Sequence, residues 1–438
     1  MDQPLRLGLA GLGTVGTSVI RLLREHEEAL TERAGRPLRL VAVSARDQTK
    51  DRGVALDDLE WFSDAEALAR SANVDCVVEL IGGEDGVARS SAMAALAAGK
   101  SLVTANKALL AAHGVELAAA AEANGAMLSF EAAVGGGIPI VKSLREALAG
   151  NRVTKLFGIL NGTCNYILTR MESEGLTFEE CLAEAQALGY AEADPTFDVE
   201  GLDTAHKLAV LTALAFGVTI DKESIFVEGI SSIAPEDIAA ADELGYRIKL
   251  LGVAQETETG IEQRVHPTML PKDSNVARIA GVTNAVAVEG DFVGSVVLSG
   301  PGAGGDATAS AVVSDIVDCA RGFRAPPLGK PVANLRPYQR ARMRAHSGGY
   351  YLRLTVPDRV GAFAAIARAM ADQSISLDSI VQRNRPAGAA PRRRSEELRA
   401  VTIITHDTTE QAVRDALRRI EAEGDIVGQP QMIRIEAL

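Results

Sequence analysis

Acidic side chains gather directly in front of a strongly apolar segment. Residues 192–207 read Glu-Ala-Asp-Pro-Thr-Phe-Asp-Val-Glu-Gly-Leu-Asp-Thr-Ala-His-Lys, and residues 208–216 are almost wholly apolar. Asp203 and Lys207 are four residues apart, which places them on one face of a helix. The apolar continuation predicts that this helix is buried, with Lys207 in an acid-lined cleft. A lysine in that setting can accept or donate a proton, and the acids would suit a ligand with an ammonium group.

A surface ion pair, which contributes well under about 1 kcal/mol, is the alternative interpretation of Asp203 and Lys207. His206 points off their shared face by one residue, and we interpret it as structural. A second lysine, Lys107, ends the run Thr-Ala-Asn-Lys that begins with the last residue of a predicted strand over residues 101–104. Ligands of open α/β sheets bind beyond the carboxyl ends of the strands. From spacing alone, a functional Lys107 and a surface lysine are equally good interpretations.

A glycine loop follows the first predicted strand, residues 5–10, and leads into a predicted helix, residues 15–24. Its pattern is G-x-G-x-x-G, which in this context indicates a dinucleotide site. The glycines allow a tight turn, close approach of the backbone to a pyrophosphate, and close packing of helix on sheet. Free N–H groups at the helix N-terminus favour the anion. A structural glycine turn is the alternative. The loop consists of Gly11, Leu12, Gly13, Thr14, Val15 and Gly16.

The end of the second predicted strand, residues 38–43, should contact the adenosine ribose. An Asp or Glu there would favour NAD. The sequence instead offers Arg46, which could pair with a 2′-phosphate and so favours NADP. The neighbouring Asp47 keeps NAD open.

Two other glycine-rich turns could bring main-chain oxygen atoms to a ligand. Residues 131–139 place the Glu131 carboxylate before three consecutive glycines, and such a set of oxygen atoms could hold a hard monovalent or divalent cation. A plain tight turn is the simpler interpretation from composition. Residues 300–305 are also rich in glycine, which suggests close approach of the backbone to a ligand or to another segment.

The elements that must position these residues fall into three units. Residues 1–135 alternate strands and helices, which predicts a Rossmann-type doubly wound parallel sheet in an α/β protein. We expect residues 136–307 to form a second, α+β unit for catalysis and dimerisation, and a helix over residues 308–322 to return to the first unit. A proline-rich linker over residues 323–349 precedes residues 350–438, whose order β-α-β-β-α-β predicts a ferredoxin-like unit. The arginine-rich stretch 383–394 is expected to be a solvated loop.

Composition bounds the function. The chain has 438 residues, 47% hydrophobic and 24% charged, with a formal charge of −13, which argues against an extended nucleic-acid-binding surface. Its four cysteines form no C-x-x-C pair, which argues against a zinc or redox motif and favours a reducing compartment. The longest apolar stretch is too short to cross a bilayer. We therefore expect a cytoplasmic protein without membrane partners.

Together these motifs closely resemble the homoserine dehydrogenase family. The most specific matches are Asn-Gly-Thr-Cys-Asn-Tyr at residues 161–166 and the block at residues 192–207. Residues 350–405 resemble an ACT regulatory domain. The resemblance implies NAD(P)-dependent interconversion of L-homoserine and L-aspartate 4-semialdehyde in threonine, methionine and isoleucine biosynthesis. It also implies feedback inhibition by L-threonine near Asp358 and Gly361, and a homodimer or homotetramer.

The resemblance assigns roles by motif. Lys207 would be the acid/base residue at the substrate C4 oxygen, and Lys107 would lie between nicotinamide and substrate. Glu192 and Asp203 would hold the substrate ammonium, with Asp198 supporting that network. Further expected contacts are to the cofactor from Thr104 and Gly304, and to a monovalent cation, Na⁺, from Glu131 and the main-chain oxygens of Val134, Gly136 and Ile138.

Two other functions remain open from the sequence. A catalytically silent sensor could bind nucleotide and amino acid through the Rossmann and ACT units, although the set of Glu192, Asp203 and Lys207 argues against it. The second alternative is a different oxidoreductase that acts on a semialdehyde. An aspartate semialdehyde dehydrogenase would need a placed catalytic cysteine, whereas Cys164 stands in the homoserine dehydrogenase pattern.

Overall fold

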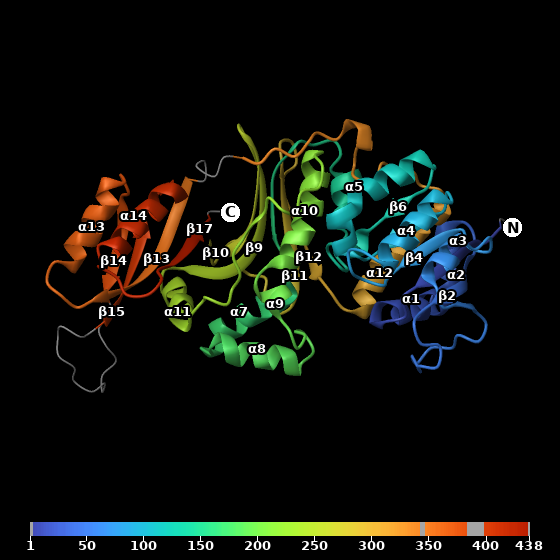
Figure 1. Cartoon of the computed structure of the whole chain (residues 1–438), viewed down its shortest axis with the longest axis horizontal. Helices are drawn as coiled ribbons and strands as arrows, with labels where there is room; N and C mark the ends of the chain where they lie inside the picture. Colours follow the sequence, from blue (N-terminus) through green and yellow to red (C-terminus); the bar gives the residue numbers. More distant parts are fainter. Residues whose placement is uncertain (1–2, 342–346, 383–397, 437–438) are drawn as a thin grey trace.

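The computed structural model describes residues 3–341, 347–382 and 398–436. Three units follow one another along the long axis of the molecule, from the N-terminal unit through a central unit to the C-terminal one (Figure 1). The stretch 383–394, expected to be a solvated loop, lies outside the described residues. Within the described ranges, no helix has both the length and the apolar character needed to cross a membrane.

The N-terminal unit is a parallel sheet in the order β3-β2-β1-β4-β5-β6, the Rossmann order. The predicted doubly wound fold is thus confirmed. Its apolar strands are buried because helices cover both faces. The strands are β1 (Leu5–Ala10), β2 (Leu38–Ser44), β3 (Glu60–Phe62), β4 (Cys76–Glu79), β5 (Ser101–Thr104) and β6 (Leu128–Ser129). The helices are α1 (Thr14–Glu25), α2 (Glu27–Ala34), α3 (Ala65–Arg70), α4 (Val87–Ala97) and α5 (Lys107–Ala123).

The central unit is built on a mixed sheet, with β7, β9, β10, β11 and β12 as neighbours. Its strands are β7 (Val153–Ile159), β8 (Phe226–Val227), β9 (Tyr246–Thr257), β10 (Gly260–Pro271), β11 (Thr283–Gly290) and β12 (Gly294–Pro301). Its helices are α6 (Ile140–Lys142), the π-helix Ser143–Ala147, α7 (Gly162–Glu174), α8 (Phe178–Ala187), α9 (Thr196–Val199), α10 (Leu202–Phe216) and α11 (Pro235–Glu243). The next helix, α12 (Gly305–Arg321), packs against α1, and its Val312 and Ile316 share a buried cluster with Leu7 and Leu9 of β1.

Some strands differ from the sequence-based expectation. The hairpin of β11 and β12 was not predicted, because its many small residues give a weak strand signal. Residues 227–230 have the apolar pattern of a short strand, but β8 ends at Val227. A Cβ on Gly229 would lie 2.4 Å from the Val199 carbonyl oxygen, so at this point the chain packs against the segment that leads into α10 rather than extending a strand.

The C-terminal unit has the predicted β-α-β-β-α-β order, and its sheet continues that of the central unit. Strands β10 and β17 pair in parallel at Thr268–Arg434 and Met269–Ile435, giving one 11-stranded sheet. The elements are β13 (Ser347–Pro357), α13 (Ala362–Asp372), β14 (Leu377–Gln382), β15 (Leu398–Thr405), β16 (Thr408–Thr409), α14 (Glu410–Ala422) and β17 (Gln431–Ile435).

Two arginines of the C-terminal unit make ionic contacts close to this strand pairing. Arg434, whose side chain is fully buried, contacts Glu228 of the central unit at 2.7 Å and Glu410 of α14 at 2.7 Å. Arg353 of β13 donates to Asp237 of α11 at 2.6 Å. The C-terminal unit is therefore docked firmly on the central one.

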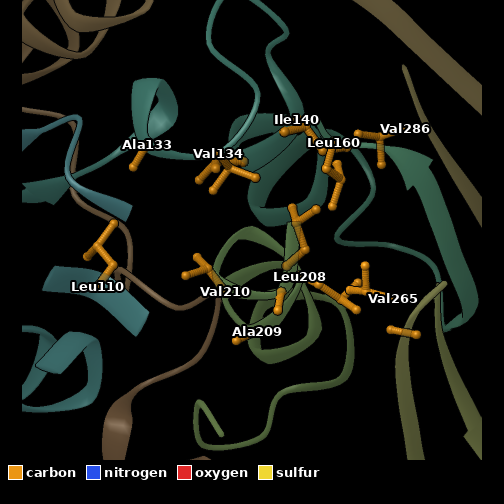
Figure 2. Packing of buried hydrophobic residues seen from close by; sticks show 14 of the residues in the cluster. Leu110, Ala133, Val134, Ile140, Leu160, Leu208, Ala209, Val210, Val265 and Val286 are labelled. Atoms are coloured by element: carbon orange, nitrogen blue, oxygen red, sulfur yellow. The ribbon is translucent and has the colours of Figure 1, made fainter. Parts of the chain in front are cut away.

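The helix α10 lies at the centre of the largest hydrophobic cluster. Its Leu208, Ala209 and Val210 pack among Leu110, Val134, Ile140, Leu160, Val265 and Val286 (Figure 2). The expected buried helix with Asp203 and Lys207 on one face is thus confirmed, and it spans Leu202–Phe216. Because neighbours enclose this helix on several sides, the side chains of its first turns are held in place.

Candidate active site

The carboxylate of Asp203 joins two lysines from different parts of the chain. Lys107 Nζ lies 2.7 Å from Oδ1 and Lys207 Nζ lies 2.8 Å from Oδ2. Asn161 Nδ2 also donates to Oδ2, at 2.9 Å. Asp203 is 3% exposed and Lys207 is buried, whereas the Lys107 side chain is 35% exposed, so the shared carboxylate lies out of bulk water while Lys107 reaches solvent. The structure therefore brings together the two lysines that the sequence singled out separately.

Each lysine is placed by the end of a secondary-structure element. Lys207 follows Asp203 by one turn of α10, and its Nζ also donates to the Leu160 carbonyl at 2.8 Å, just after β7. Lys107 is the first residue of α5, whose N-terminus is capped by Asn106 through the Leu109 N–H. Both lysines thus lie where the parallel sheet of the N-terminal unit meets the central unit.

Charge and burial act in opposite directions on Asp203. Burial alone would raise the pKa of this carboxyl, but the Lys207 and Lys107 ammonium groups and their hydrogen bonds hold it far below its ordinary value. Burial likewise opposes the charge of Lys107, and the Asp203 charge overcomes it, so the pKa of Lys107 is raised. The stable state of the site at neutral pH is therefore an Asp203 carboxylate beside a Lys107 ammonium.

Glu192 and Asp198, the other two acids that the family resemblance singles out, are less enclosed than Asp203. Asp198 is half-buried and accepts from Asn161 Nδ2 at 2.8 Å, and burial together with the Asp203 charge raises its pKa. Glu192 is exposed, yet its charge acts on Lys107. The structure thus places Glu192 and Asp198 around the lysines but not in ion pairs with them.

The glycine loop has the close contacts that its pattern predicted. Gly11 has a φ of +105°, and a Cβ there would lie 2.4 Å from the Leu80 carbonyl oxygen. A Cβ on Gly16 would lie 2.1 Å from the Gly11 carbonyl oxygen. Gly13 and Thr14 are exposed at the start of α1, whose N-terminus has no side-chain cap. A Cβ on Gly13 would meet no described atom within 4 Å, so the free N–H groups fit a pyrophosphate.

A second helix begins beside this loop. Gly304 precedes α12 with a φ of +106°, and a Cβ on the next residue, Gly305, would lie 2.8 Å from Ser18 Oγ of α1. Asp306 accepts from Ser18 at 2.8 Å. The N-termini of α1 and α12 therefore lie side by side, and the main chain at Gly304 is near the glycine loop.

The end of β2 presents a free cation. Arg46 is exposed, and among the described residues no ion pair or hydrogen bond engages its side chain. Asp47 instead turns its carboxylate back onto Thr49, accepting from the backbone N–H at 2.8 Å and the hydroxyl at 2.7 Å. Gly11 donates to the Ser44 carbonyl at 2.9 Å, which keeps this strand end against the glycine loop.

The turn after Glu131 is tightly packed. The two carboxylate oxygens of Glu131 accept from the Val141 and Lys142 N–H groups, each at 2.8 Å, and burial raises its pKa to about 7. Gly136 has a φ of +59°, and a Cβ there would lie 2.4 Å from the Gly302 carbonyl oxygen. The two glycine-rich turns noted in the sequence are thus in contact with each other.

Sequence reasoning gave no role to two polar residues of this region. Asn161 binds both Asp203 and Asp198, and it also caps α7 through the Cys164 N–H at 2.8 Å. Glu79 is fully buried at the end of β4 and accepts from the Thr104 hydroxyl at 2.6 Å. The sequence signal that could have identified Glu79 is that it is the lone acid in the otherwise apolar strand Cys-Val-Val-Glu. The Thr104 hydroxyl is thus engaged with the neighbouring strand of the sheet.

Comparison with known proteins gives a consistent result. Family models match for "Homoserine dehydrogenase, NAD binding domain" over residues 11–131, "Homoserine dehydrogenase" over residues 139–317 and "ACT domain" over residues 350–424. The homoserine dehydrogenase of Pseudomonas aeruginosa is 42% identical over 444 residues, covering 100% of both chains. The chain belongs to the homoserine dehydrogenase family. It is therefore an NAD(P)-dependent oxidoreductase.

Solved structures of this family share the fold. The homoserine dehydrogenase of Thiobacillus denitrificans superposes with a TM-score of 0.92 at 45% identity, covering 99% of each chain. That of S. aureus gives a TM-score of 0.76 at 29% identity over 100% of each chain. A hyperthermophilic archaeal homoserine dehydrogenase, solved in complex with NADPH, gives a TM-score of 0.64 at 26% identity and covers 74% of this chain and 99% of its own.

We expect Asp203→Asn to lower kcat by about 100-fold or more. The substitution removes the one carboxylate that both lysines share, so two ammonium groups would face each other without a counter-charge. Steady-state kinetics with L-homoserine measures the effect. Asp194→Asn is the matched control, because Asp194 lies in the same segment but is exposed and bonds to Thr196 instead of a lysine. If the Asp203→Asn enzyme kept an unchanged kcat, the contacts of Asp203 with the two lysines would have only a structural role.

Proposed function

We propose that the chain interconverts L-homoserine and L-aspartate 4-semialdehyde, with Lys207 handling the proton of the C4 oxygen. The observation that carries this proposal is the set of partners around Lys207 Nζ. An ammonium group has three N–H donors, and Asp203 and Leu160 take two of them. One donor direction remains for a substrate oxygen. When bound, the nicotinamide gives or receives the hydride at C4.

The proton step follows from this geometry. A neutral Lys207 amine accepts the hydroxyl proton during oxidation, and its ammonium returns that proton during reduction. Lys107, held by Asp203, orients the same oxygen from the side of the parallel sheet. Because the Asp203 carboxylate is occupied by both lysines and Asn161, we assign the substrate ammonium chiefly to Glu192 and Asp198. Asp203 then acts mainly by fixing the lysines.

We expect Lys207→Ala to lower kcat by about 100-fold or more while leaving the cofactor Kd nearly unchanged. The substitution removes the Lys207 amine that moves the proton. It leaves the contacts of the glycine loop, which binds the cofactor in this proposal, unchanged. Stopped-flow kinetics and fluorescence titration with the cofactor separate the two effects. Lys272→Ala, which removes a lysine paired with Asp242, serves as the control. A fully active Lys207→Ala enzyme would remove the proposed role.

The preferred cofactor in this proposal is NADP. Arg46 is free at the end of β2, and Asp47, the residue that could have favoured NAD, is engaged with Thr49. A guanidinium in this position suits the 2′-phosphate. The pyrophosphate contacts come from the N–H groups of residues 11–16, with Thr104 and Gly304 contributing main-chain contacts.

We expect Arg46→Ala to raise the KM for NADP by about tenfold or more and to leave the KM for NAD unchanged, since only NADP carries the 2′-phosphate. Parallel assays with both cofactors test this. Arg39→Ala is the control, because Arg39 lies near the start of β2 and pairs with Glu27. An equal change for both cofactors would contradict the assignment.

A monovalent cation, Na⁺, is proposed at the turn after Glu131, held by Glu131 and by the main-chain oxygens of Val134, Gly136 and Ile138. The support is the tight contact of this turn with residue 302 and the acidic, buried position of Glu131. The cation would neutralise charge and fix the turn. We expect a higher thermal midpoint in NaCl than in choline chloride for the wild type, and a smaller difference for Glu131→Gln. Equal wild-type midpoints in the two salts would argue against the site.

Regulation by L-threonine through the ACT unit is proposed at the turn between β13 and α13. Asp358 lies there within 3.2 Å of Arg399, and Gly361 precedes α13 with a φ of +95°. The docking of this unit on the central one supplies a physical link to the catalytic part. Glu228, which contacts Arg434, lies beside Gly229, whose neighbour Ile230 donates to the Val199 carbonyl just ahead of α10.

We expect millimolar L-threonine to inhibit the wild type and Asp358→Ala to lose that inhibition while keeping kcat, because Asp358 is remote from Asp203. Initial rates with and without threonine measure this. Asp372→Ala, at the far end of α13, is the control. A wild-type enzyme that ignores threonine would leave the unit with an assembly role only.

Three coarser assignments complete the proposal. The unit boundaries are 1–135, 136–307, 323–349 and 350–438, with α12 assigned to the dinucleotide unit on the basis of its packing against α1. A homodimer or homotetramer is the proposed assembly. The four free cysteines support the reducing cytoplasm as its location.

A further inference from the structure

An aromatic side chain lies beside the charged site without belonging to the core. Phe197 is on the short helix α9, within the acid-rich segment, and is 39% exposed. The hydrophobic clusters of the described residues do not include it. Single exposed apolar side chains are ordinary on protein surfaces, so what distinguishes Phe197 is its position beside the Lys107 ammonium group.

The Phe197 ring faces the ammonium group of Lys107. Lys107 Nζ lies 5.7 Å from the ring centroid and, on its other side, 2.7 Å from Asp203 Oδ1. An aromatic face attracts a cation at this distance. Lys107 stands in the first turn of α5, where the helix dipole disfavours a positive charge. Its position therefore depends on partners that compensate, and the structure supplies a carboxylate and an aromatic face.

His206 fixes the plane of that ring. The centroids of Phe197 and His206 are 5.3 Å apart with an interplanar angle of 85°, an edge-to-face contact. Burial, together with the charge of Lys222, lowers the pKa of His206. A neutral imidazole packs against the ring without adding a positive charge beside Lys107. The sequence-based interpretation of His206 as structural thus becomes more specific.

We propose that Phe197 is a positioning residue of the active site, whose ring, oriented by His206, holds the Lys107 ammonium against Asp203. This inference rests on the proposed role of Lys107. Phe197 does not itself touch the reacting atoms. By favouring the charged amine, the ring keeps Lys107 pointed at the cleft when the substrate enters and leaves.

Phe197→Leu tests the ring directly, because leucine keeps an apolar side chain but has no aromatic face. We expect kcat to fall about two- to fivefold, with the KM for the cofactor unchanged. Loss of the ring disfavours the Lys107 ammonium, so the limb of the kcat–pH profile that reports Lys107 should move to lower pH by about half a unit. Phe197→Tyr, which keeps a ring, should restore most of both losses.

Two controls make the outcome decisive. Phe292→Leu removes a phenylalanine that is 90% exposed between β11 and β12, and it should change neither kcat nor the pH profile. In a Lys107→Ala background, Phe197→Leu should cause no further loss, since the ring acts through Lys107. Wild-type kinetics for Phe197→Leu, or an equal loss with and without Lys107, would overturn the inference. If Lys107→Ala itself retained full activity, the proposed role of Lys107 would fail first, which separates the two failures.

Discussion

The structure depends on one buried carboxylate that two ammonium groups share. Asp203 receives Lys107 from the N-terminal unit and Lys207 from its own helix, and Asn161 satisfies it further. Taking these charges out of water is expensive, and a buried ion pair is often no more stabilising than an apolar replacement. The arrangement is therefore better explained by the need to position the two lysines than by a contribution to the stability of the fold. It fixes two amines at a defined separation in the junction between the dinucleotide-binding unit and the central unit.

The rest of the fold serves that geometry. The apolar sides of α10 bury it among segments of both units, so the first turn of the helix cannot move independently of either (Figure 2). The parallel sheet brings α5 and its Lys107 to the carboxyl edge of the strands, where the glycine loop also lies. At the other end, β17 extends the central sheet into the ACT unit. A ligand bound there can influence the site through these packed elements.

Local patterns allowed much of this to be predicted from the sequence. The glycine loop, the burial of α10 and the order of elements in the ACT unit each follow from periodicity and turn residues within a short window. The meeting of Lys107 with Asp203 could not be predicted, because it depends on how two units pack. The same holds for the two-residue pairing of β10 with β17 and for the contacts of Asn161. The β11–β12 hairpin, which forms one edge of the central sheet, was also missed, because its residues give only a weak strand signal.

The most direct test of the account is a crystal structure of the chain with NADP and L-homoserine bound together. The account predicts the C4 hydroxyl within hydrogen-bond distance, about 3 Å, of Lys207 Nζ, with the Lys107–Asp203 contact intact and the nicotinamide ring on the side of the parallel sheet. A C4 hydroxyl directed away from both lysines, with Asp203 instead bound to the substrate ammonium, would contradict it.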